Sequence, residues 1–402
     1  MSQPVKRFSM FWFAGLSMLG FIATDMYLPA FEALQAEFET SQALIALTLS
    51  VFLLGMAAGQ LVYGPLSDRF GRKRVLAFGL SVFAIASVGC AYAETVEQLI
   101  CARFLQALGV CSATVIWQAV VIDRYQGKAA ERIFATIMPL VALSPALAPL
   151  LGAYLQQAFG WRVIFLLLVG FAIVLLFMTS RETESAPRHT LTKTAGAGLI
   201  ANYRALLSSR QFVGYMLMFS GCSAAFFAYL TGIPFVMAGM GYEATDIGWS
   251  FVPQTIAFLV GGFGCRSLLK RHPSERLILW GLALFMVSVA IIVVITLVLK
   301  PQSIVPILIP FCFMAIANGA LYPLVINKAL QPFKNFSATA SGLLNFLQTL
   351  LCFAASALVS NWVEQHQAIA VAATMTLAAL TVQLGYSWAR KTQSEPKLTA
   401  DL

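Results

Sequence analysis

The stretch of sequence that decides the fold is Gly64-Pro65-Leu66-Ser67-Asp68-Arg69-Phe70-Gly71-Arg72-Lys73-Arg74. Five of these residues are charged, although only 11% of the chain is charged. Apolar runs of about 20 residues lie on both sides, and each is long enough for a helix to cross a bilayer. Glycine permits a tight bend, and basic side chains mark the cytoplasmic side of a membrane. We therefore expect a short cytoplasmic turn between two membrane helices.

Long apolar runs and short charged turns alternate through all 402 residues. The chain is 59% hydrophobic with a mean hydropathy of +0.80, which excludes a soluble globular protein. The pattern predicts an all-α membrane protein with twelve transmembrane helices in two six-helix halves. The expected spans are Phe8–Ala30, Leu44–Tyr63, Val75–Tyr92, Leu99–Ile122, Ile133–Ala158, Val163–Ser180, Phe212–Met237, Ile247–Leu268, Leu277–Leu299, Ile304–Ile326, Ala338–Ser360 and Ala368–Trp388.

The longest polar stretch lies between the sixth and seventh spans and divides the chain. We expect an N-terminal six-helix bundle at 1–180, a cytoplasmic linker at 181–211, a C-terminal six-helix bundle at 212–390 and a cytoplasmic tail at 391–402. A basic turn follows both span two and span eight, which favours an internal duplication. The second turn, Gly264–Arg271, keeps the basic charge but has no aspartate.

Lysine and arginine side chains collect on one side of the predicted spans. Of the 26, only Arg162 and Lys300 fall in expected outer turns, and Arg103 lies within a span. The positive-inside rule then places both termini in the cytoplasm. The net charge of +9 therefore reflects topology, and nucleic acid is not an expected partner. Seven cysteines without C-x-x-C spacing predict neither a disulfide framework nor a metal site.

Two ionisable residues lie well inside predicted spans, Asp25 in the first and Arg103 in the fourth. A charge at the membrane centre costs about 3 kcal/mol, so each must face a cavity or a partner. Burial favours the protonated form of a carboxyl, which predicts that Asp25 carries protons. The alternative is a carboxylate that reaches the outer interface. Arg103 stays charged, either as a fixed cation in proton coupling or as a structural group bonded to carbonyls.

Polar and aromatic side chains within the spans are candidates for substrate binding. Amides beside aromatic rings suit a planar, hydrogen-bonding or cationic ligand, whereas Asn and Gln also join membrane helices to one another. The candidates are Tyr27, Trp117, Gln118, Phe226, Tyr229, Gln254, Asn318, Tyr322, Asn345 and Gln348. The sequence has no nucleotide-binding loop, zinc-protease motif or catalytic triad pattern, so we do not expect an enzyme.

Three motifs connect the sequence to a known family. The stretch Gly64–Arg74 resembles the G-x-L-x-D-R-x-G-R-K loop of major facilitator superfamily transporters. The segment Arg103–Gly109 resembles the superfamily's R-x-x-Q-G-x-G motif, with Ala107 in place of its first glycine. Span five, through Ser144–Ala153, is similar to the antiporter motif of drug:proton exchangers, although two of its glycines are alanine here. Together with Thr24–Pro29, these motifs resemble the Bcr/CflA group of bacterial drug:proton antiporters.

The resemblance implies the major facilitator fold and a secondary transporter of the bacterial inner membrane. It implies that Asp68, Arg72 and Asp123 form a latch for the outward-facing state. It also implies export of drugs or purine nucleosides by alternating access, with the proton gradient as energy source and no cofactor. Three further stretches look closest to the PunC branch of purine nucleoside transporters: Val115–Ala119, Val252–Leu259 and Ala315–Ala320. The expected partners are a small-molecule substrate, protons and the lipid bilayer, and the expected state is a monomer.

Two alternatives remain open at the level of sequence. The first is import of purine nucleosides by proton symport, because the direction of transport is set by coupling and gradients. The second, from another class, is a membrane receptor or an intramembrane enzyme. It would predict an extramembrane ligand domain or paired catalytic groups at one depth, and the sequence indicates neither.

Overall fold

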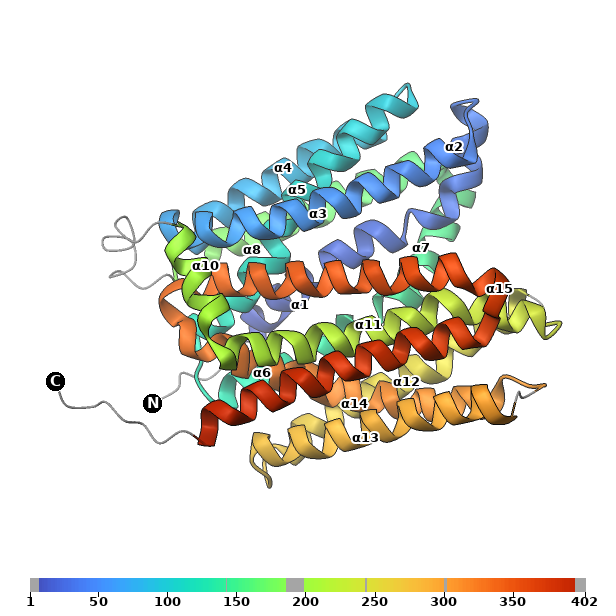
Figure 1. The fold of residues 1–402 in the computed structure, drawn as a ribbon. Coiled ribbons are helices and arrows are strands. Elements are labelled where there is room, and N and C mark those ends of the chain that lie inside the picture. The colour runs from blue at the N-terminus through green and yellow to red at the C-terminus, as the bar shows by residue number, and fades with distance from the viewer. Residues whose placement is uncertain (1–6, 142, 186–198, 243, 300–301, 395–402) are drawn as a thin grey trace. The chain divides into compact units, whose positions relative to one another are not determined.

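The computed structural model describes residues 7–141, 143–185, 199–242, 244–299 and 302–394, and these residues form helices without any strand (Figure 1). The first half contains α1 (Arg7–Asp25), α2 (Phe31–Glu37), α3 (Gln42–Phe70), α4 (Arg72–Ala91), α5 (Val96–Arg124), α6 (Lys128–Val141), α7 (Ser144–Phe159) and α8 (Arg162–Arg181). The second half contains α10 (Leu199–Ser208), α11 (Arg210–Gly239), α12 (Ala244–Leu268), α13 (Ser274–Val294), α14 (Val305–Leu330) and α15 (Ser337–Ser394). Nine stretches of this described chain are long and apolar enough to cross a membrane.

The first predicted span, Phe8–Ala30, has the same bounds as a candidate membrane span of the structure, but its helix is interrupted near the end. Helix α1 ends at Asp25, and a short 3-10 turn, η1 (Leu28–Ala30), follows. Pro29 explains the interruption, because proline lacks the N–H that would continue the helix. The consequence is that Asp25 lies at a helix end within this span.

The fifth predicted span is divided into two helices. One helix is expected over Ile133–Ala158, but α6 ends at Val141 and α7 begins at Ser144. Prolines lie inside both helices, at Pro139 and Pro149, and proline bends or interrupts a helix. Conversely, the last two predicted spans lie in one helical element, α15, which turns back on itself at its labelled bend in Figure 1.

The turn at Gly64–Arg74 is shorter than predicted. Helix α3 continues through Pro65 to Phe70, and α4 begins at Arg72. Only Gly71 departs from helical geometry, with φ of 97° and ψ of 149°. This conformation is accessible to glycine and strained for other residues. A single glycine therefore reverses the chain between two long helices.

The chain forms two compact units. The first comprises Met1–Ile133, Leu140–Leu199 and Phe333–Phe346, and the second comprises Phe134–Pro139, Ile200–Pro332 and Leu347–Leu402. The first unit thus contains the beginning of α15 in addition to the N-terminal helices. The predicted boundaries of the two bundles stay a prediction. Much of the predicted linker (186–198) and of the predicted tail (395–402) lies outside the described residues.

Packing within each unit places the candidate residues. In the first unit, α5 packs against both α3 and α4, and α4 packs against α8. In the second unit, α14 packs against α11, α12 and α13. Helices α5 and α14 are therefore central in their units, which explains why their polar side chains, such as Arg103 and Asn318, are fully buried.

Candidate functional site

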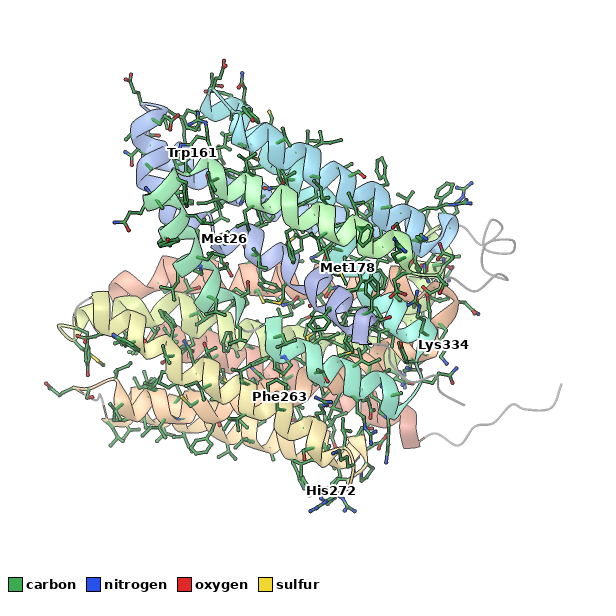
Figure 2. The ribbon with its side chains drawn as sticks, turned by 180° about the vertical axis from the view of Figure 1, so that it is seen from behind. Met26, Trp161, Met178, Phe263, His272 and Lys334 are labelled. Atoms are coloured by element: carbon green, nitrogen blue, oxygen red, sulfur yellow. The ribbon has the colours of Figure 1, made fainter. Side chains whose placement is uncertain are left out.

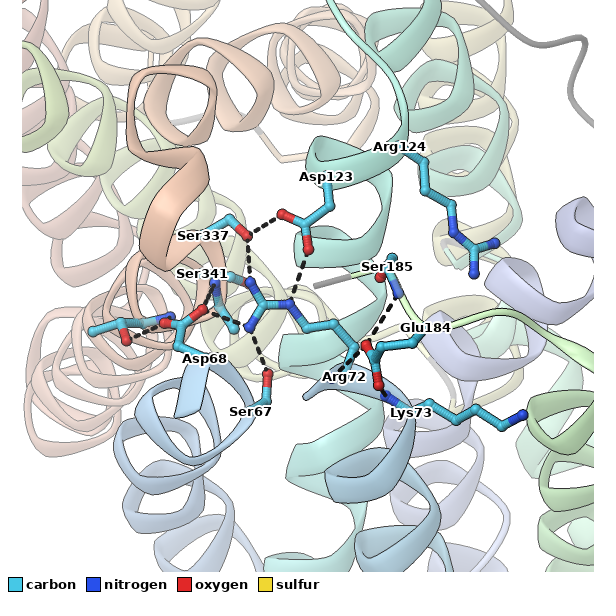
Figure 3. Close-up of polar contacts among 12 residues, drawn as sticks. Ser67, Asp68, Arg72, Lys73, Asp123, Arg124, Glu184, Ser185, Ser337 and Ser341 are labelled. Carbon is cyan, nitrogen blue, oxygen red and sulfur yellow. Dashed lines mark hydrogen bonds and ion pairs between the residues drawn. The ribbon is translucent and has the colours of Figure 1, made fainter. Parts of the chain in front are cut away.

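An ion cluster joins the end of α3, the beginning of α4 and the end of α5. Arg72 Nη1 donates to Asp68 Oδ1 at 2.5 Å, and Arg72 Nε donates to Asp123 Oδ2 at 2.9 Å (Figure 3). Arg72 is 1% exposed and Asp68 is 2% exposed. The structure thus brings together the three residues predicted to form a latch. Their role in gating stays a prediction.

The beginning of α15 binds the carboxylate of Asp68, one of the two acids of this cluster. Asp68 accepts hydrogen bonds from the backbone N–H groups of Ala338 at 3.3 Å and Thr339 at 2.8 Å. The Thr339 hydroxyl also donates to Asp68. The first N–H groups of a helix lack partners within the helix, and the helix dipole favours negative charge at this end. Asp68 therefore accepts hydrogen bonds both from Arg72 and from the N-terminus of α15.

Ser337 connects the other two members of the cluster. Its hydroxyl donates to Asp123 Oδ1 at 2.7 Å and accepts from Arg72 Nη2 at 3.1 Å. A buried ion pair is stable only when its remaining donors and acceptors are also satisfied. Removing one partner from such a cluster typically costs about 3–5 kcal/mol, because a buried charge is left behind.

Glycines allow α3 and α15 to touch along their backbones. A Cβ atom on Gly64 would lie 2.5 Å from the carbonyl oxygen of Ala338, and one on Gly342 would lie 2.2 Å from that of Gln60. No side chain fits in either place without displacing backbone. The glycines are therefore part of what brings Asp68 to the beginning of α15.

A second polar group lies further along the same helices. Gln118 Oε1 accepts from Ser341 Oγ at 2.7 Å and from Asn345 Nδ2 at 3.3 Å. Trp117, the neighbour of Gln118 in sequence, is 2% exposed. Two predicted substrate-binding residues, Gln118 and Asn345, thus bind each other within the first unit. This is the helix-joining role that amides often have in membrane proteins.

Asp25, the predicted proton carrier, lies at the end of α1. Its Oδ1 accepts from Thr24 Oγ1 at 3.2 Å, whereas Oδ2 is buried and has no hydrogen-bond partner in the part of the chain that the structure describes. Met26, labelled in Figure 2, follows it directly. A Cβ atom on Gly152 of α7 would lie 2.0 Å from the Met26 carbonyl oxygen. The glycine of the antiporter-like segment therefore packs beside the residue that follows Asp25.

Arg103 lies fully buried among aromatic rings. Its Nη1 donates to the carbonyl oxygen of Ala23 at 3.1 Å and to Gln106 Oε1 at 2.6 Å. The guanidinium carbon lies 4.2 Å from the ring centre of Phe52 and 4.5 Å from that of Tyr27, which are cation–π distances. Its Nε and Nη2 atoms have no hydrogen-bond partner among the described residues.

Arg103 and Asp25 are close in the first unit without an ion pair between them in the described chain. Arg103 binds the carbonyl of Ala23, two residues before Asp25. The hydroxyl of Tyr27, two residues after Asp25, forms a 2.6 Å hydrogen bond with Thr48. The end of α1 is thus held on both sides of the carboxyl, while one carboxyl oxygen stays without a partner.

The second unit contains an aromatic cluster made of predicted substrate-binding residues and their neighbours. Tyr229 and Phe311 stack with ring centres 3.4 Å apart, and Phe226 stacks on Phe311 at 5.5 Å. Phe258 makes edge contacts with Phe226 at 6.5 Å and with Tyr322 at 5.6 Å. The structure therefore brings Phe226, Tyr229 and Tyr322 into one group of rings.

Amides and a hydroxyl of the second unit carry polar atoms without partners. Asn318 Nδ2 donates to the carbonyl oxygen of Cys222 at 3.3 Å. Within the described residues, Asn318 Oδ1, Tyr229 Oη and Gln254 Oε1 are buried and have no hydrogen-bond partner. Buried polar atoms are almost always satisfied, so these are candidates for ligand contacts. Gln348 is half-buried in the same unit.

Sequence reasoning missed the residues that complete the ion cluster. Ser337 and Thr339 are far from Asp68 in sequence, and only the packing of α15 on α3 brings them together. One signal was available, because serine and threonine before an apolar run often begin a helix. Glu184, which binds the first turn of α4, also went unrecognised in the predicted linker.

Comparison with known proteins decides the family. The Major Facilitator Superfamily profile matches residues 13–356. The chain belongs to this superfamily. The predicted fold class, an all-α membrane protein with twelve transmembrane helices in two six-helix halves, is thereby confirmed. The protein is a transporter that acts on small molecules.

Similar proteins agree with this assignment. The chain is 29% identical over 381 residues to the uncharacterized MFS-type transporter YdgK of Bacillus subtilis (strain 168), and the aligned residues cover 92% of each protein. It is 28% identical over 378 residues to the chloramphenicol resistance protein of Pseudomonas aeruginosa, covering 92% of this chain and 87% of that protein. The crystal structure of FucP in the outward conformation has a TM-score of 0.75 at 13% identity, covering 96% and 99% of the two chains, and shows the fold alone.

Proposed function

We propose that the chain is a proton-coupled secondary transporter that exports small organic substrates by alternating access. The observation that supports coupling is Asp25, whose Oδ2 is buried without a hydrogen-bond partner in the described chain. A buried carboxylate without a cation is costly, and protonation removes that cost. Binding and release of a proton at Asp25 would then depend on whether water reaches it.

The roles of the other residues follow from their surroundings. Arg103 is a fixed cation beside the end of α1, and its bond to the Ala23 carbonyl ties the position of that helix end to α5. Asp68, Arg72 and Asp123 act as the latch, because a buried and fully bonded ion cluster resists opening until all its bonds break together.

Location and energy source are part of the same proposal. The protein is a member of the Bcr/CflA group in the bacterial inner membrane, with both termini in the cytoplasm. The proton gradient drives transport, no cofactor takes part and the monomer is the working state. The distribution of basic residues supports the orientation.

Drugs and purine nucleosides are the proposed substrates. The stacked rings of the second unit, together with the unpartnered oxygens of Gln254 and Asn318, suit a flat ligand with N–H donors. The relative from Pseudomonas aeruginosa is named a chloramphenicol resistance protein. The same features suit a purine nucleoside. Because they do not determine the direction of transport, nucleoside import by proton symport is the second candidate.

The carboxyl assignment is tested with purified protein in liposomes. Asp25→Asn should abolish substrate flux driven by a pH gradient, whereas counterflow without a gradient should persist, since the amide cannot exchange a proton. Glu97→Gln is a matched control, because Glu97 is an exposed acid in the first turn of α5. Gradient-driven flux that is unchanged in Asp25→Asn would refute the assignment.

Direction and substrate class are separated by the same liposomes. Labelled adenosine and ethidium are compared with the interior either more acidic or more alkaline than the exterior. Uptake driven by an acidic interior indicates antiport, and uptake driven by an acidic exterior indicates symport. Saturable adenosine flux without ethidium flux would identify a nucleoside carrier, and the reverse would identify a drug exporter.

A further inference from the structure

The first turn of α4 lacks a cap of its own. The residue before the helix is Gly71, which has no side chain, and the first bond within the chain runs from the N–H of Val75 to the carbonyl of Gly71. The N–H groups of Arg72 and Lys73 therefore need partners from elsewhere. Glu184 supplies them, because its Oε1 accepts from Arg72 N at 2.9 Å and its Oε2 from Lys73 N at 3.2 Å (Figure 3).

Glu184 belongs to a four-residue segment, Glu182–Ser185, that directly follows α8; we call it the linker strap. Glu182 accepts from Ser9 Oγ of α1 at 2.7 Å and from Arg124 Nη1 at the end of α5 at 2.6 Å. The carbonyl oxygen of Thr183 accepts from Arg124 Nη2 at 2.5 Å. The linker strap thus connects α1, α4 and α5, all within the first unit.

The linker strap binds Arg72 and the residue next to Asp123, and so has contacts on both sides of the Arg72–Asp123 ion pair. On one side it holds the N–H of Arg72 itself. On the other it accepts hydrogen bonds from the guanidinium of Arg124, the residue next to Asp123. Arg72 must then reach Asp68, which in turn binds the N–H groups of Ala338 and Thr339. A continuous series of hydrogen bonds leads from Glu184 to the beginning of α15.

We infer that the linker strap is a positioning element for the ion cluster, with Glu184 as its central residue. Glu184 fixes the start of α4 so that the Arg72 guanidinium meets Asp68 and Asp123 together. A carboxylate suits this position, since it accepts two N–H groups at once and complements the helix dipole. The assignment deepens the proposed latch, but it is a statement about geometry and does not depend on proton coupling.

The test measures backbone hydrogen exchange by mass spectrometry in full-length protein in lipid nanodiscs, without substrate or gradient. Glu184→Ala should accelerate exchange of the first-turn amides of α4. It should also accelerate exchange at Ala338 and Thr339 by about fivefold, the effect of losing one helix cap. Glu184→Gln keeps an acceptor and should give a smaller change, and it serves if the alanine variant does not fold. Glu97→Ala is the control and should change neither region.

A double variant separates positioning from a local cap. In an Asp68→Asn background, Glu184→Ala should no longer change exchange at Ala338 and Thr339, because the connection to α15 is already broken. Faster exchange confined to α4 in the single variant would overturn the inference. So would an undiminished effect at α15 in the double variant. Because no flux is measured, failure of the transport proposal would leave this result intact.

Discussion

The two basic turns that suggest a duplication have different structures. In the first, a single residue, Gly71, separates α3 from α4, and Arg72 is 1% exposed within a bonded ion cluster. In the second, five residues separate α12 from α13, and Arg266, Lys270 and Arg271 are exposed. The second turn ends near His272, labelled in Figure 2, whose ring packs edge-on against Trp280.

The presence of an acid explains the difference. Burying an arginine requires a carboxylate within reach and partners for the remaining donors. Asp68 meets this need in the first turn, and the second turn has no counterpart. Glu275, which follows the second turn in the first helical turn of α13, instead pairs with Lys328 at a partly exposed position. Charge of the same sign therefore becomes a buried cluster in one half and a solvated turn in the other.

The largest effect is expected from removing the acid of the first turn. Asp68→Asn leaves Arg72 with one carboxylate partner, Asp123. The backbone N–H groups of Ala338 and Thr339 then face either the amide N–H₂ or an amide oxygen, which is a weaker acceptor than a carboxylate. The cluster should lose about 3–5 kcal/mol of stabilisation. The initial rate of flux should fall at least about tenfold. Lys270→Gln in the second turn is the control. Equal effects of the two changes would remove the contrast between the turns.

A matched pair of glycines gives the next effect. A Cβ on Gly64 would meet the backbone of α15, whereas one on Gly264 would have nothing within 4 Å. Gly64→Ala should lower the free energy of unfolding by about 1–3 kcal/mol, as overpacking does, and Gly264→Ala should leave it nearly unchanged. Thermal unfolding in nanodiscs measures both. A neutral Gly64→Ala would show that α3 and α15 do not need close approach.

A smaller effect is expected from the ion pair of the second half. The side chains of Lys328 and Glu275 are 24% and 50% exposed, so their attraction is screened by solvent. Glu275→Gln should change the free energy of unfolding by less than about 1 kcal/mol, and high salt should abolish the difference. Destabilisation as large as that of Asp68→Asn would contradict the view that burial sets the strength of these pairs.

The smallest effect on stability is expected at Glu37, which lies outside both turns and interacts with Trp161 and Arg162. Trp161 Nε1 donates to Glu37 Oε2 at 2.6 Å and Arg162 Nη1 donates to Oε1, which together hold the pKa of Glu37 below its ordinary value. The added stability is present above the ordinary pKa and is lost as pH falls through the lowered one. The side chain is 42% exposed, so less than about 1 kcal/mol is involved.

The measurement for Glu37 compares thermal midpoints of the unaltered protein and Glu37→Gln between pH 7 and pH 3. The gap between them should be widest near neutral pH and should close toward acid. A gap that is constant over this range would show that the hydrogen bonds to Trp161 and Arg162 do not depend on the charge of Glu37.

Much of the fold follows from the sequence because membrane solvation is a strong constraint. Apolar runs of sufficient length must be helical in lipid, since every backbone polar group needs a partner. The positions of most spans, the family and the residue types of the ion cluster were therefore accessible from the sequence. The break between α6 and α7 was not predicted, because hydropathy does not show where a proline-containing span is interrupted.

The sequence by itself determined which charges had to be buried, since acids and arginines within apolar runs have few alternatives. Only the tertiary structure decided their partners. Asp68 binds the beginning of α15, Glu184 caps α4, and Arg103 binds the Ala23 carbonyl instead of Asp25. These contacts join residues far apart in the chain, and their geometry depends on the close approach of helices at glycines such as Gly64. Local sequence patterns carry the chemistry of each group, and helix packing sets which groups meet.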